Sequence, residues 1–512
     1  MSTKKILAVL LALFVLATAV SGCGNSGSSS ADSQSGSSET SENSASTEDT
    51  ASTDGEVPTI SLMVVCGTTP PDADAVAEKL SEITREKIGC NVEFITMEIG
   101  NVAQQLNLLL SGGDDTLDVF MAGISVPYST IVNNGQALSL DTLMEPYAEE
   151  VKTALGEKVY ESGRVNGELY GIGRLLDQAS TTCYNLRRDI AEEFGYKNGD
   201  KVDLAELTEL FGKVREKYPD TPLIGPMNGV PSIGDSRIDS LGNKLGVLDN
   251  YGQDTTVTNY YESAGYEELV GYFKQWKEMG CYMADILNVT DAPIDYIPSG
   301  KAFGCFASHF SAEMNGIWSS QNFGTDIASL QIYEDAVAIT PGAYECINPA
   351  TKNPEAAAAL IYLMATDPDV ENLLINGIEG QHYQVLEDNT ATYVDGKDIS
   401  TTGWCLGYSW TALNSTISIP FEYPADYYDR MLAANKNAQQ SKAFGCQFDL
   451  TGVSDAVSAC TNVVNQYENA LSGGAVEDFD ATLAQFQQGL RDAGIDEIVA
   501  AKQEQLDAFL AG

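Results

Sequence analysis

Few side chains in this 512-residue sequence stand at spacings that could perform catalysis. The two histidines, His309 and His382, lie far apart and outside any spacing typical of metal ligands. No Gly-x-Ser-x-Gly motif occurs, and Gly300-Lys301 lacks the upstream glycine of a phosphate-binding loop. The 73 Asp and Glu residues make carboxylate pairs inevitable, so counting them does not identify a glycosidase. The sequence therefore favours a binding protein without cofactor or metal, with a cell-surface glycoside-active enzyme as the alternative.

An aromatic cluster could form a sugar-binding surface. Trp404, Tyr408 and Trp410 fall within one short segment, and alternation would place them on one side of an extended chain. Flat aromatic faces suit a sugar ring, and the two neighbouring glycines would let a ligand approach closely. The alternative is that these side chains pack in a hydrophobic core, which is what we expect for Trp276 in its helical context.

The N-terminus resembles the signal sequence of a bacterial lipoprotein. Lys4 and Lys5 precede an apolar run over residues 6–20, which is too short to cross a bilayer. The run ends at Val20-Ser21-Gly22-Cys23, which is similar to a lipobox. We expect residues 1–22 to be a signal peptide and Cys23 to be lipidated. The alternative is an ordinary secretory signal that happens to contain a cysteine.

A polar segment follows the signal. Residues 24–56 contain no aromatic and no large aliphatic side chain, so they cannot bury enough surface to offset the entropy of ordering. We predict that residues 23–57 form a disordered tether between the membrane and a folded body.

Net charge and cysteine spacing exclude two classes of protein. A formal charge of −45 would repel nucleic acid and anionic lipid, which both require Lys and Arg patches. None of the ten cysteines forms a Cys-x-x-Cys pair, so the simplest zinc and redox motifs are absent from the sequence. We therefore expect no nucleic-acid partner and no direct membrane contact except through a lipid.

The folded body shows an α/β pattern. Apolar runs at 60–65, 91–98 and 117–123 alternate with helical patterns over 72–89 and 102–110, which predicts an open parallel sheet. Ligands of such sheets bind beyond the carboxyl ends of the strands, where the loops at 67–69 and 123–126 would lie. Further helices are predicted at 184–195, 204–218, 453–471 and 479–510.

Several short segments, in this order and spacing, resemble family 1 extracellular solute-binding proteins of bacterial ABC transporters. The segment 367–383 is also similar to a lipoprotein subgroup with a C-terminal extension, whose W-x-x-x-N pattern is echoed by Trp410 and Asn414. Gly173 departs from the proline that is usual in the family, and residues 406–414 match it only loosely. The other matching segments are NGELYGI (166–172), LNLLLSGGDDTLDVF (106–120), LRRD (186–189), GKA (300–302) and NPEAAAAL (353–360).

This resemblance implies a two-lobed α/β fold of the type II periplasmic-binding-protein class, with a ligand cleft between lobes joined by hinge strands. The expected lobes are 58–177 with about 335–400, and 178–334 with about 401–512. Hinge closure on a small nutrient, which we expect to be a sugar or an oligosaccharide, would precede delivery to ABC permease subunits. The protein would be a lipid-anchored, extracytoplasmic monomer; a non-transport binding or sensor protein is a further alternative.

The resemblance also suggests ligand contacts. Thr68 and Thr69 follow the first strand, and Asp177 and Tyr184 flank the expected hinge; each could instead serve a cap or a turn. The complete set of expected ligand-binding residues is Thr68, Thr69, Asp177, Tyr184, Trp404, Tyr408, Trp410 and Asn414.

Overall fold

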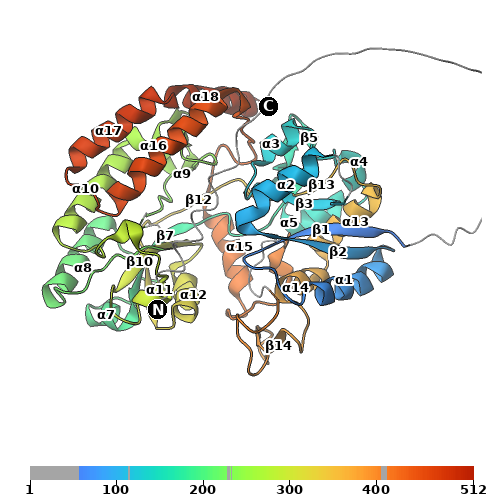
Figure 1. Ribbon diagram of the computed structural model, residues 1–512, viewed down its shortest axis with the longest axis horizontal. Helices are drawn as coiled ribbons and strands as arrows, with labels where there is room; N and C mark the ends of the chain where they lie inside the picture. Colours follow the sequence, from blue (N-terminus) through green and yellow to red (C-terminus); the bar gives the residue numbers. More distant parts are fainter. Residues whose placement is uncertain (1–56, 113–115, 228–230, 232, 405–411, 512) are drawn as a thin grey trace, which may run out of the picture. The chain divides into compact units, whose positions relative to one another are not determined.

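The computed structural model describes residues 57–112, 116–227, 231, 233–404 and 412–511 (Figure 1). Tyr408 and Trp410, like Cys23, therefore lie outside the described residues. The folded body contains two separate main sheets, each with its own hydrophobic core. We call the bodies built on these sheets the first and the second lobe.

The first lobe is built on a five-stranded sheet in the order β2-β1-β3-β13-β6. Strand β1 pairs in parallel with β2 and β3, whereas β13 runs antiparallel to β3 and β6. Seven of the eight residues of β1 are buried, as expected for a continuous apolar strand covered on both faces. The strands are β1 (Thr59–Cys66), β2 (Asn91–Glu98), β3 (Val119–Ala122), β6 (Gly171–Gly173) and β13 (Tyr344–Ile347).

Helices supply the apolar residues that cover this sheet. One core joins β1 to α1 (Ala73–Lys87), α5 (Ala148–Leu155), α13 (Pro354–Thr366) and α14 (Pro368–Asn376). A second core joins Met63 and Val65 of β1, together with Phe120–Ala122 of β3, to α2 (Val102–Ser111) and α3 (Tyr128–Asn133). The sequence-based prediction of β1, α1, β2, α2 and β3 in this order is confirmed. The smaller elements of this lobe are α4 (Asp141–Met144), α6 (Glu157–Glu161), β4 (Arg164–Val165), β5 (Glu168–Leu169), β14 (Tyr383–Val385) and β15 (Ala391–Tyr393).

The second lobe is built on a three-stranded antiparallel sheet in the order β10-β7-β11. Strand β7 (Thr181–Arg187) is central, and six of its seven residues are buried. The helix predicted over 184–195 is therefore wrong in its first half: β7 pairs on both sides through residue 187, and α7 begins only at Arg188. The other bounds are β10 (Gly304–His309), β11 (Ile327–Gln331), α7 (Arg188–Glu193), α8 (Leu204–Lys217), α10 (Ala264–Glu278), α11 (Pro293–Tyr296) and α12 (Ala312–Phe323).

The C-terminal residues form three helices that join the core of the second lobe. They are α16 (Ser454–Ser472), α17 (Phe479–Asp492) and α18 (Ile495–Ala511), and they contribute Cys460, Phe486 and Ile498 to the core that contains Trp276. The predicted helix over 479–510 is interrupted at Gly494, whose φ of 93° ends α17. Figure 1 shows these helices in red beside α10. We call residues 442–511 the C-terminal module.

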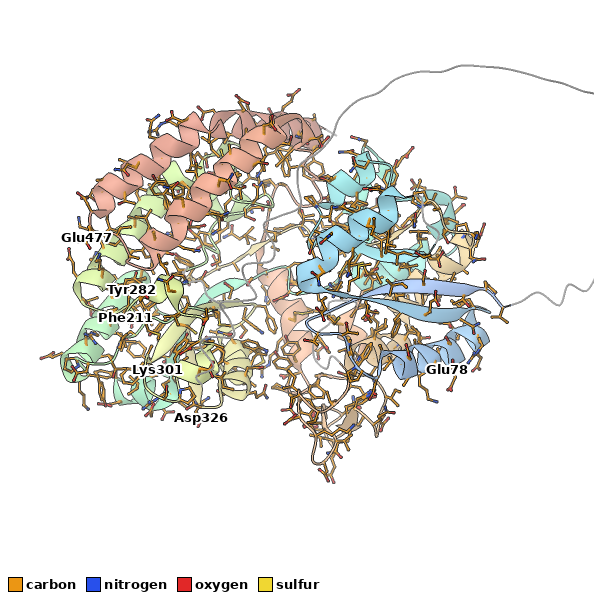
Figure 2. The ribbon with its side chains drawn as sticks, viewed as in Figure 1. Glu78, Phe211, Tyr282, Lys301, Asp326 and Glu477 are labelled. Carbon is orange, nitrogen blue, oxygen red and sulfur yellow. The ribbon has the colours of Figure 1, made fainter. Side chains whose placement is uncertain are left out.

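The side chains of the folded body are divided between buried cores and an exposed surface. Phe211 lies in the core of the second lobe, whereas charged residues such as Glu78 and Glu477 lie at the surface (Figure 2). The eight cysteines of the described residues are buried free thiols. Among the described residues, no helix is long and apolar enough to cross a membrane.

Candidate functional site

Three chain segments connect the two lobes, and they lie side by side. The first crossing covers residues 174–180, between β6 and β7. The second, between β11 and β13, contains β12 (Val337–Ala338), and the third, which follows residue 421, contains α15 (Tyr427–Asn437) and β16 (Gln439–Gln440). Strand β12 pairs in parallel with β16, and Ala338 forms an antiparallel bridge with Ala179. We call these paired segments the hinge.

The helix of the third crossing is hydrogen-bonded to the first crossing through one side chain. Asn435, near the end of α15 (Tyr427–Asn437), accepts hydrogen bonds from the main-chain N–H of Gln178 (2.9 Å) and Ala179 (3.2 Å). Its amide group donates to the carbonyl oxygen of Leu176 at 2.7 Å. Asn435 was not foreseen from the sequence, because nothing in its neighbourhood identifies a partner more than 250 residues away.

A cavity of about 390 Å³ lies beside the hinge. Its walls come from the first lobe (Gly123, Tyr128), the second crossing (Thr340, Gly342) and the loop Asp239–Asn243 of the second lobe. Gly123, with φ of 107°, ends β3 where the second crossing passes: a Cβ there would lie 2.1 Å from the carbonyl oxygen of Gly342. The cavity is thus at the carboxyl end of β3, where the sequence pattern predicts a ligand.

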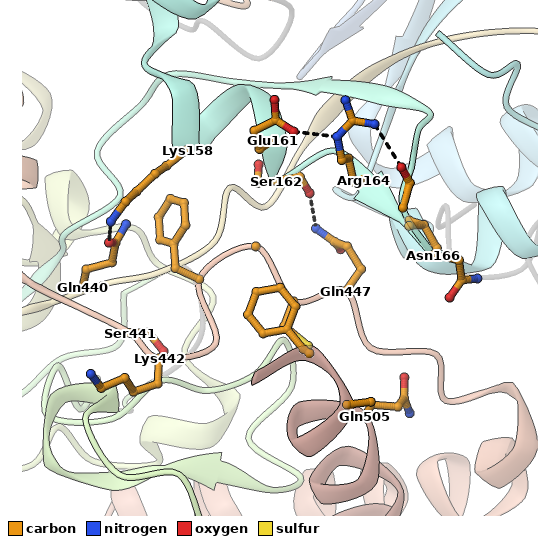
Figure 3. Close-up of a pocket in the computed structure, with 17 residues that line it drawn as sticks. Lys158, Glu161, Ser162, Arg164, Asn166, Gln440, Ser441, Lys442, Gln447 and Gln505 are labelled. Atoms are coloured by element: carbon orange, nitrogen blue, oxygen red, sulfur yellow. Dashed lines mark hydrogen bonds and ion pairs between the residues drawn. The ribbon is translucent and has the colours of Figure 1, made fainter. Parts of the chain in front are cut away.

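A larger groove of about 870 Å³ lies on the other side of the segment that follows the third crossing (Figure 3). Gln447, which lines both hollows, donates to the carbonyl oxygen of Ser162 (3.0 Å) and to the hydroxyl of Tyr344 (2.7 Å). In the groove, Arg164 is already bonded to Glu161 and Asp141. Because the groove lies against the β4–β5 hairpin and α18, away from the carboxyl ends of the parallel strands, we take the smaller cavity as the candidate site.

A group of aromatic side chains lies at the edge of the second lobe near the first crossing. The rings of Tyr423 and Tyr427 are stacked with centroids 3.9 Å apart, and the Phe310 ring lies 5.2 Å from that of Tyr427. The ring of His309, the last residue of β10, is tilted against that of Phe310 with centroids 4.6 Å apart, and burial lowers the pKa of its imidazole to about 4. Such surfaces can accept the apolar face of a sugar ring.

Asp177, on the first crossing, is close enough to Tyr427 to influence it electrostatically. The carboxylate is accessible to solvent, yet the protein atoms around it displace water and raise its pKa to about 6. An accessible but poorly hydrated carboxylate is suited to accept hydrogen bonds from a ligand. Contact between Asp177 and a ligand stays a prediction.

Thr68 and Thr69 are also accessible to a ligand. Both side chains are exposed in the loop after β1, and the N–H of Thr69 donates to Glu98 Oε1 at 3.4 Å. Their contact with a ligand stays a prediction.

Three other expected contacts are corrected by the structure. Tyr184 is fully buried in the core of the second lobe, where its hydroxyl donates to the carbonyl oxygen of Leu223 at 2.7 Å. Trp404 is 4% exposed, belongs to the core of the first lobe and donates its indole N–H to the carbonyl oxygen of Leu374. Asn414 is also buried, and its amide group donates to the carbonyl oxygen of Ala365. The polar group of each residue is hydrogen-bonded within the protein interior, so none of the three faces the cleft.

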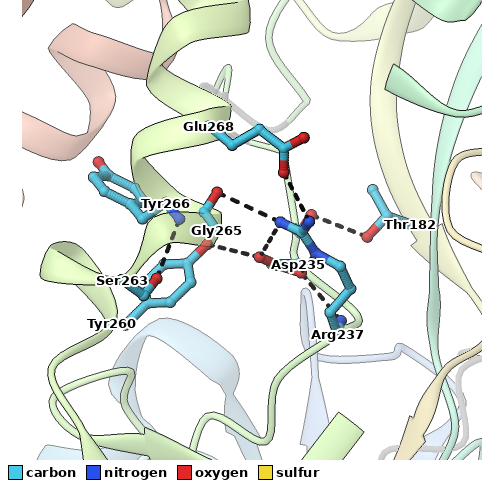
Figure 4. Close-up of polar contacts among 9 residues, drawn as sticks. Thr182, Asp235, Arg237, Tyr260, Ser263, Gly265, Tyr266 and Glu268 are labelled. Carbon is cyan, nitrogen blue, oxygen red and sulfur yellow. Dashed lines mark hydrogen bonds and ion pairs between the residues drawn. The ribbon is translucent and has the colours of Figure 1, made fainter. Parts of the chain in front are cut away.

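A polar cluster that the sequence did not reveal fixes the chain leading to the cavity wall (Figure 4). Arg237 contacts both carboxylate oxygens of Asp235, at 2.9 and 3.0 Å, and reaches Glu268 at 3.1 Å. Its guanidinium lies 4.6 Å from the centre of the Tyr333 ring. Arg237 therefore holds its own segment in place, two residues before Asp239 begins the wall.

A buried ionisable cluster lies where the first crossing leaves the first lobe. Arg174 donates through Nε to the carbonyl oxygen of Ala412 at 2.5 Å, and its charge faces Glu345 and Glu371. Burial raises the pKa of each carboxyl group to about 8 and lowers that of Arg174 to about 10. Both oxygens of Glu345 have no hydrogen-bond partner among the described residues. Metal-binding groups of three or more His, Cys, Asp or Glu side chains do not occur in the same part of the chain.

Comparison with known proteins relates these features to a family. The C-terminal module matches a family model described as "Domain of unknown function (DUF3502)" over residues 442–511. Over 474 residues the chain is 23% identical to a carbohydrate ABC transporter substrate-binding protein of Streptococcus pneumoniae, an alignment that covers 90% of this chain and 92% of the relative.

Solved structures share the fold over nearly the same length. The N-glycan transport solute binding protein NgtS of S. pneumoniae superposes with a TM-score of 0.76 at 20% identity, covering 89% of this chain and 99% of that one. An extracellular solute-binding protein from Bifidobacterium longum subsp. infantis gives a TM-score of 0.61 at 15% identity, covering 90% and 100%. The resemblance drawn from the sequence is thus confirmed, and the chain has the two-lobed α/β fold of extracellular solute-binding proteins.

Proposed function

We propose that this protein is a lipid-anchored extracytoplasmic solute-binding protein that captures a sugar or oligosaccharide and delivers it to an ABC importer. The observation that carries the proposal is the hinge: three crossings, hydrogen-bonded to one another, join two separately packed lobes beside a cavity. Folds of this construction close around a ligand by small backbone rotations at the crossings. The relative of known class is a carbohydrate ABC transporter substrate-binding protein, which supports a carbohydrate as the ligand.

The following side chains of the described residues do not line the cavity of about 390 Å³, and they would hold the part of a ligand that extends beyond it. The aromatic group at Tyr423 and Tyr427 would stack on a sugar ring, and Asp177 would accept hydrogen bonds from two of its hydroxyls. Thr68 and Thr69 would add hydroxyl contacts from the first lobe. We keep Tyr408 and Trp410 as further proposed contacts from the sequence alone.

The lobe boundaries that we propose differ slightly from those expected from the sequence. Leu413 and Phe421 pack in the core of the first lobe together with Trp404. Helix α15, by contrast, packs through Met431 against Phe310 and Met314 of the second lobe. We therefore propose that the C-terminal part of the second lobe begins after residue 421 rather than at about 401, while 58–177 with about 335–400 stay in the first lobe.

Catalysis is the competing function, and we propose that the protein is not an enzyme. Its homologues are binding proteins. Release of reducing sugar from an oligosaccharide by the purified protein would favour the glycoside-active alternative. Tight binding without any effect on uptake would instead favour a sensor or other non-transport role.

The proposal is tested by binding and closure measured together. The probe is Man5GlcNAc, with which the structurally similar NgtS has been crystallised, beside a panel of other neutral oligosaccharides. Full-length protein carrying Cys23→Ser, which has no site for acylation, should bind at least one of them as a monomer. Its radius of gyration in small-angle X-ray scattering should fall on saturation. Saturable binding with an unchanged radius would contradict hinge closure, and no binding across the panel would contradict the carbohydrate assignment.

A further inference from the structure

The C-terminal module touches the cavity wall through one fully buried lysine. Lys502, on α18, has no exposed surface, and its ammonium group donates to three acceptors of a single loop. These are the carbonyl oxygens of Leu241 (2.9 Å) and Gly246 (3.0 Å) and the side-chain oxygen of Asn243 (2.7 Å). All three N–H donors of the ammonium group are thereby used. We call residues 239–246 the wall loop.

The wall loop does not have a conformation that its residues adopt readily. Leu241 and Lys244 have φ of 44° and 60°, in the left-handed region that is unfavourable for residues with a Cβ. Such a conformation persists only where surrounding contacts impose it. Within the loop, the N–H of Leu241 donates to Asp239 Oδ1, that of Leu245 to Asn243 Oδ1, and those of Asn243 and Lys244 to the carbonyl oxygen of Ser240. The carbonyl oxygens of Leu241 and Gly246 accept instead from Lys502.

Other contacts between the module and this region repeat the pattern. Lys244 pairs with Glu468 of α16 at 3.1 Å, and Gln503, next to Lys502, accepts from the N–H of Val257 at 2.7 Å. Leu506 packs with Leu241 and Val257 in a small separate core. One face of α18 thus packs against the segment that builds the cavity wall.

We propose that the C-terminal module serves to hold the wall loop in its ligand-ready shape, and that Lys502 is the positioning residue that does so. This gives a role to a module whose matching family has no described function. The ligand would not touch Lys502: the lysine acts through Asp239–Asn243, which line the cavity.

The charge of Lys502 provides a way to test the role apart from general stability. Burial lowers the pKa of its ammonium group to about 7, below the value that the group regains when the loop opens to water. The open loop therefore binds the proton more tightly than the closed loop, and a pH rising above 7 favours the closed loop. The neighbouring groups are Asp239, whose charge attracts the ammonium group, and the Phe448 ring, whose centre lies 5.9 Å from the nitrogen. The Lys244–Glu468 ion pair joins the loop to α16, and Cys446 packs in the same small core as Leu506. Burial raises the pKa of Asp239 and that of Cys446, the latter to about 12, so the linkage of both has the opposite sign. A tightening of the loop above neutral pH therefore reports Lys502.

The experiment is hydrogen exchange of the full-length Cys23→Ser protein, followed by mass spectrometry between pH 6 and 9 and corrected for intrinsic rates. In the otherwise wild-type chain, protection of peptides covering 240–246 should rise about tenfold or more as the pH rises from 7 to 9. Lys502→Met should give low protection of the same peptides at every pH, with peptides of β7 unchanged. Lys274→Met, which breaks an exposed ion pair with Asp480 elsewhere in the second lobe, should behave as wild type.

Protection of 240–246 that does not change with pH in the wild-type chain would overturn the proposal, even if Lys502→Met failed to fold. Unchanged protection in a folded Lys502→Met protein would overturn it as well. A ligand measurement, which rests on the proposed function, gives a second arm: Lys502→Met should weaken the binding of Man5GlcNAc about fivefold or more. If wild type binds no oligosaccharide but the exchange result holds, the proposed function fails while the role of Lys502 stands.

Discussion

Asp177 is the residue through which pH should control ligand binding. Its pKa of about 6 places the change of charge between pH 5 and 7, while His309, with a pKa of about 4, stays neutral across that interval. The carboxylate form accepts hydrogen bonds from sugar hydroxyls, so affinity for an oligosaccharide should fall as the pH is lowered through 6. Asp177→Asn should bind roughly tenfold more weakly at pH 7.5 and lose this pH dependence.

Calorimetric titration of both proteins at pH 5, 6, 7 and 8 measures this effect. The Thr153→Ala variant, altered on the exposed surface of α5, serves as the control and should follow wild type. Equal slopes of affinity against pH in the wild type and in Asp177→Asn would rule out the carboxylate as a ligand contact.

Glu345 should make the folded protein less stable as the pH rises. Its carboxyl group has a pKa of about 8 in the fold, against about 4.5 in the unfolded chain. Between these values the folded state keeps a proton that the unfolded state has lost, so the free energy of unfolding decreases with pH. Glu345→Gln keeps the shape without the charge, and should raise the free energy of unfolding at pH 9 by roughly 1–3 kcal/mol.

Denaturant unfolding of Glu345→Gln at pH 5 and pH 9 provides the measurement. The variant should gain more at pH 9 than at pH 5, because Glu345 is already protonated at the lower pH. Glu78→Gln, on the exposed surface of α1, should change neither value by more than about 0.5 kcal/mol. A gain that is equal at both pH values would point to packing rather than ionisation.

For single residues, the sequence did not distinguish ligand contacts from buried side chains. Trp404 and Tyr184 have the chemistry of ligand contacts, and nothing in their neighbours distinguishes a stacking platform from a core. In the core their polar groups donate to the carbonyl oxygens of Leu374 and Leu223, which are 30 and 39 residues away. Asp177, by contrast, was placed by its proximity to a matched family segment, and the structure puts it on the first crossing.

At the scale of elements, Asn435 is expected to make the first crossing and α15 move together. Its amide uses both its acceptor and its donor on main-chain groups of residues 176, 178 and 179. Asn435→Asp keeps the acceptor but sets a carboxylate oxygen against the carbonyl of Leu176, and should therefore disturb the hinge as much as Asn435→Ala. Both variants should show faster hydrogen exchange at residues 178–179 and weaker ligand binding, by about 10-fold.

Asn437→Ala is the matched control, because this exposed residue lies two positions further along α15. It should leave exchange at the first crossing unchanged. Wild-type exchange at residues 178–179 in Asn435→Asp would show that the donated hydrogen bond to Leu176 is dispensable.

Periodicity predicted the elements of the first lobe well and one element of the second lobe poorly. Strands β1 and β2 are short apolar runs bounded by turns, and a helical pattern ends at Ile88–Gly89, so local signals suffice. Residues 184–187 belong to β7 because β10 and β11 hydrogen-bond to both of its edges. Those partners are more than 100 residues distant, and no local pattern reveals them.

For the whole molecule, family likeness predicted two lobes and a hinge, but the crossing points followed only from the structure. The hinge depends on Ala179, Ala338 and Gln440 lying together, and each of these stands in a stretch without a distinctive pattern. The role proposed for the C-terminal module likewise rests on Lys502 reaching a loop some 260 residues earlier in the chain. From the sequence alone, a lysine on a helix is predicted to lie at the surface.

The attachment of the whole molecule to a membrane is the last prediction, and it rests on the sequence alone. If Cys23 carries a diacyl anchor, the acyl chains contribute about 0.8 kcal/mol for each buried methylene group, which makes the attachment effectively permanent. A flexible tether of about 33 residues would then hold the lobes roughly 30 Å from the surface.

Cys23→Ser should release the protein into the medium or leave its signal peptide uncleaved, and the protein should move from the detergent phase to the aqueous phase on Triton X-114 partitioning. Ser28→Ala, which leaves Val20-Ser21-Gly22-Cys23 intact, should stay in the detergent phase as wild type does. Because a single transmembrane anchor would survive the loss of one thiol, a Cys23→Ser protein that partitions like wild type would show that the lipid is not what holds this protein.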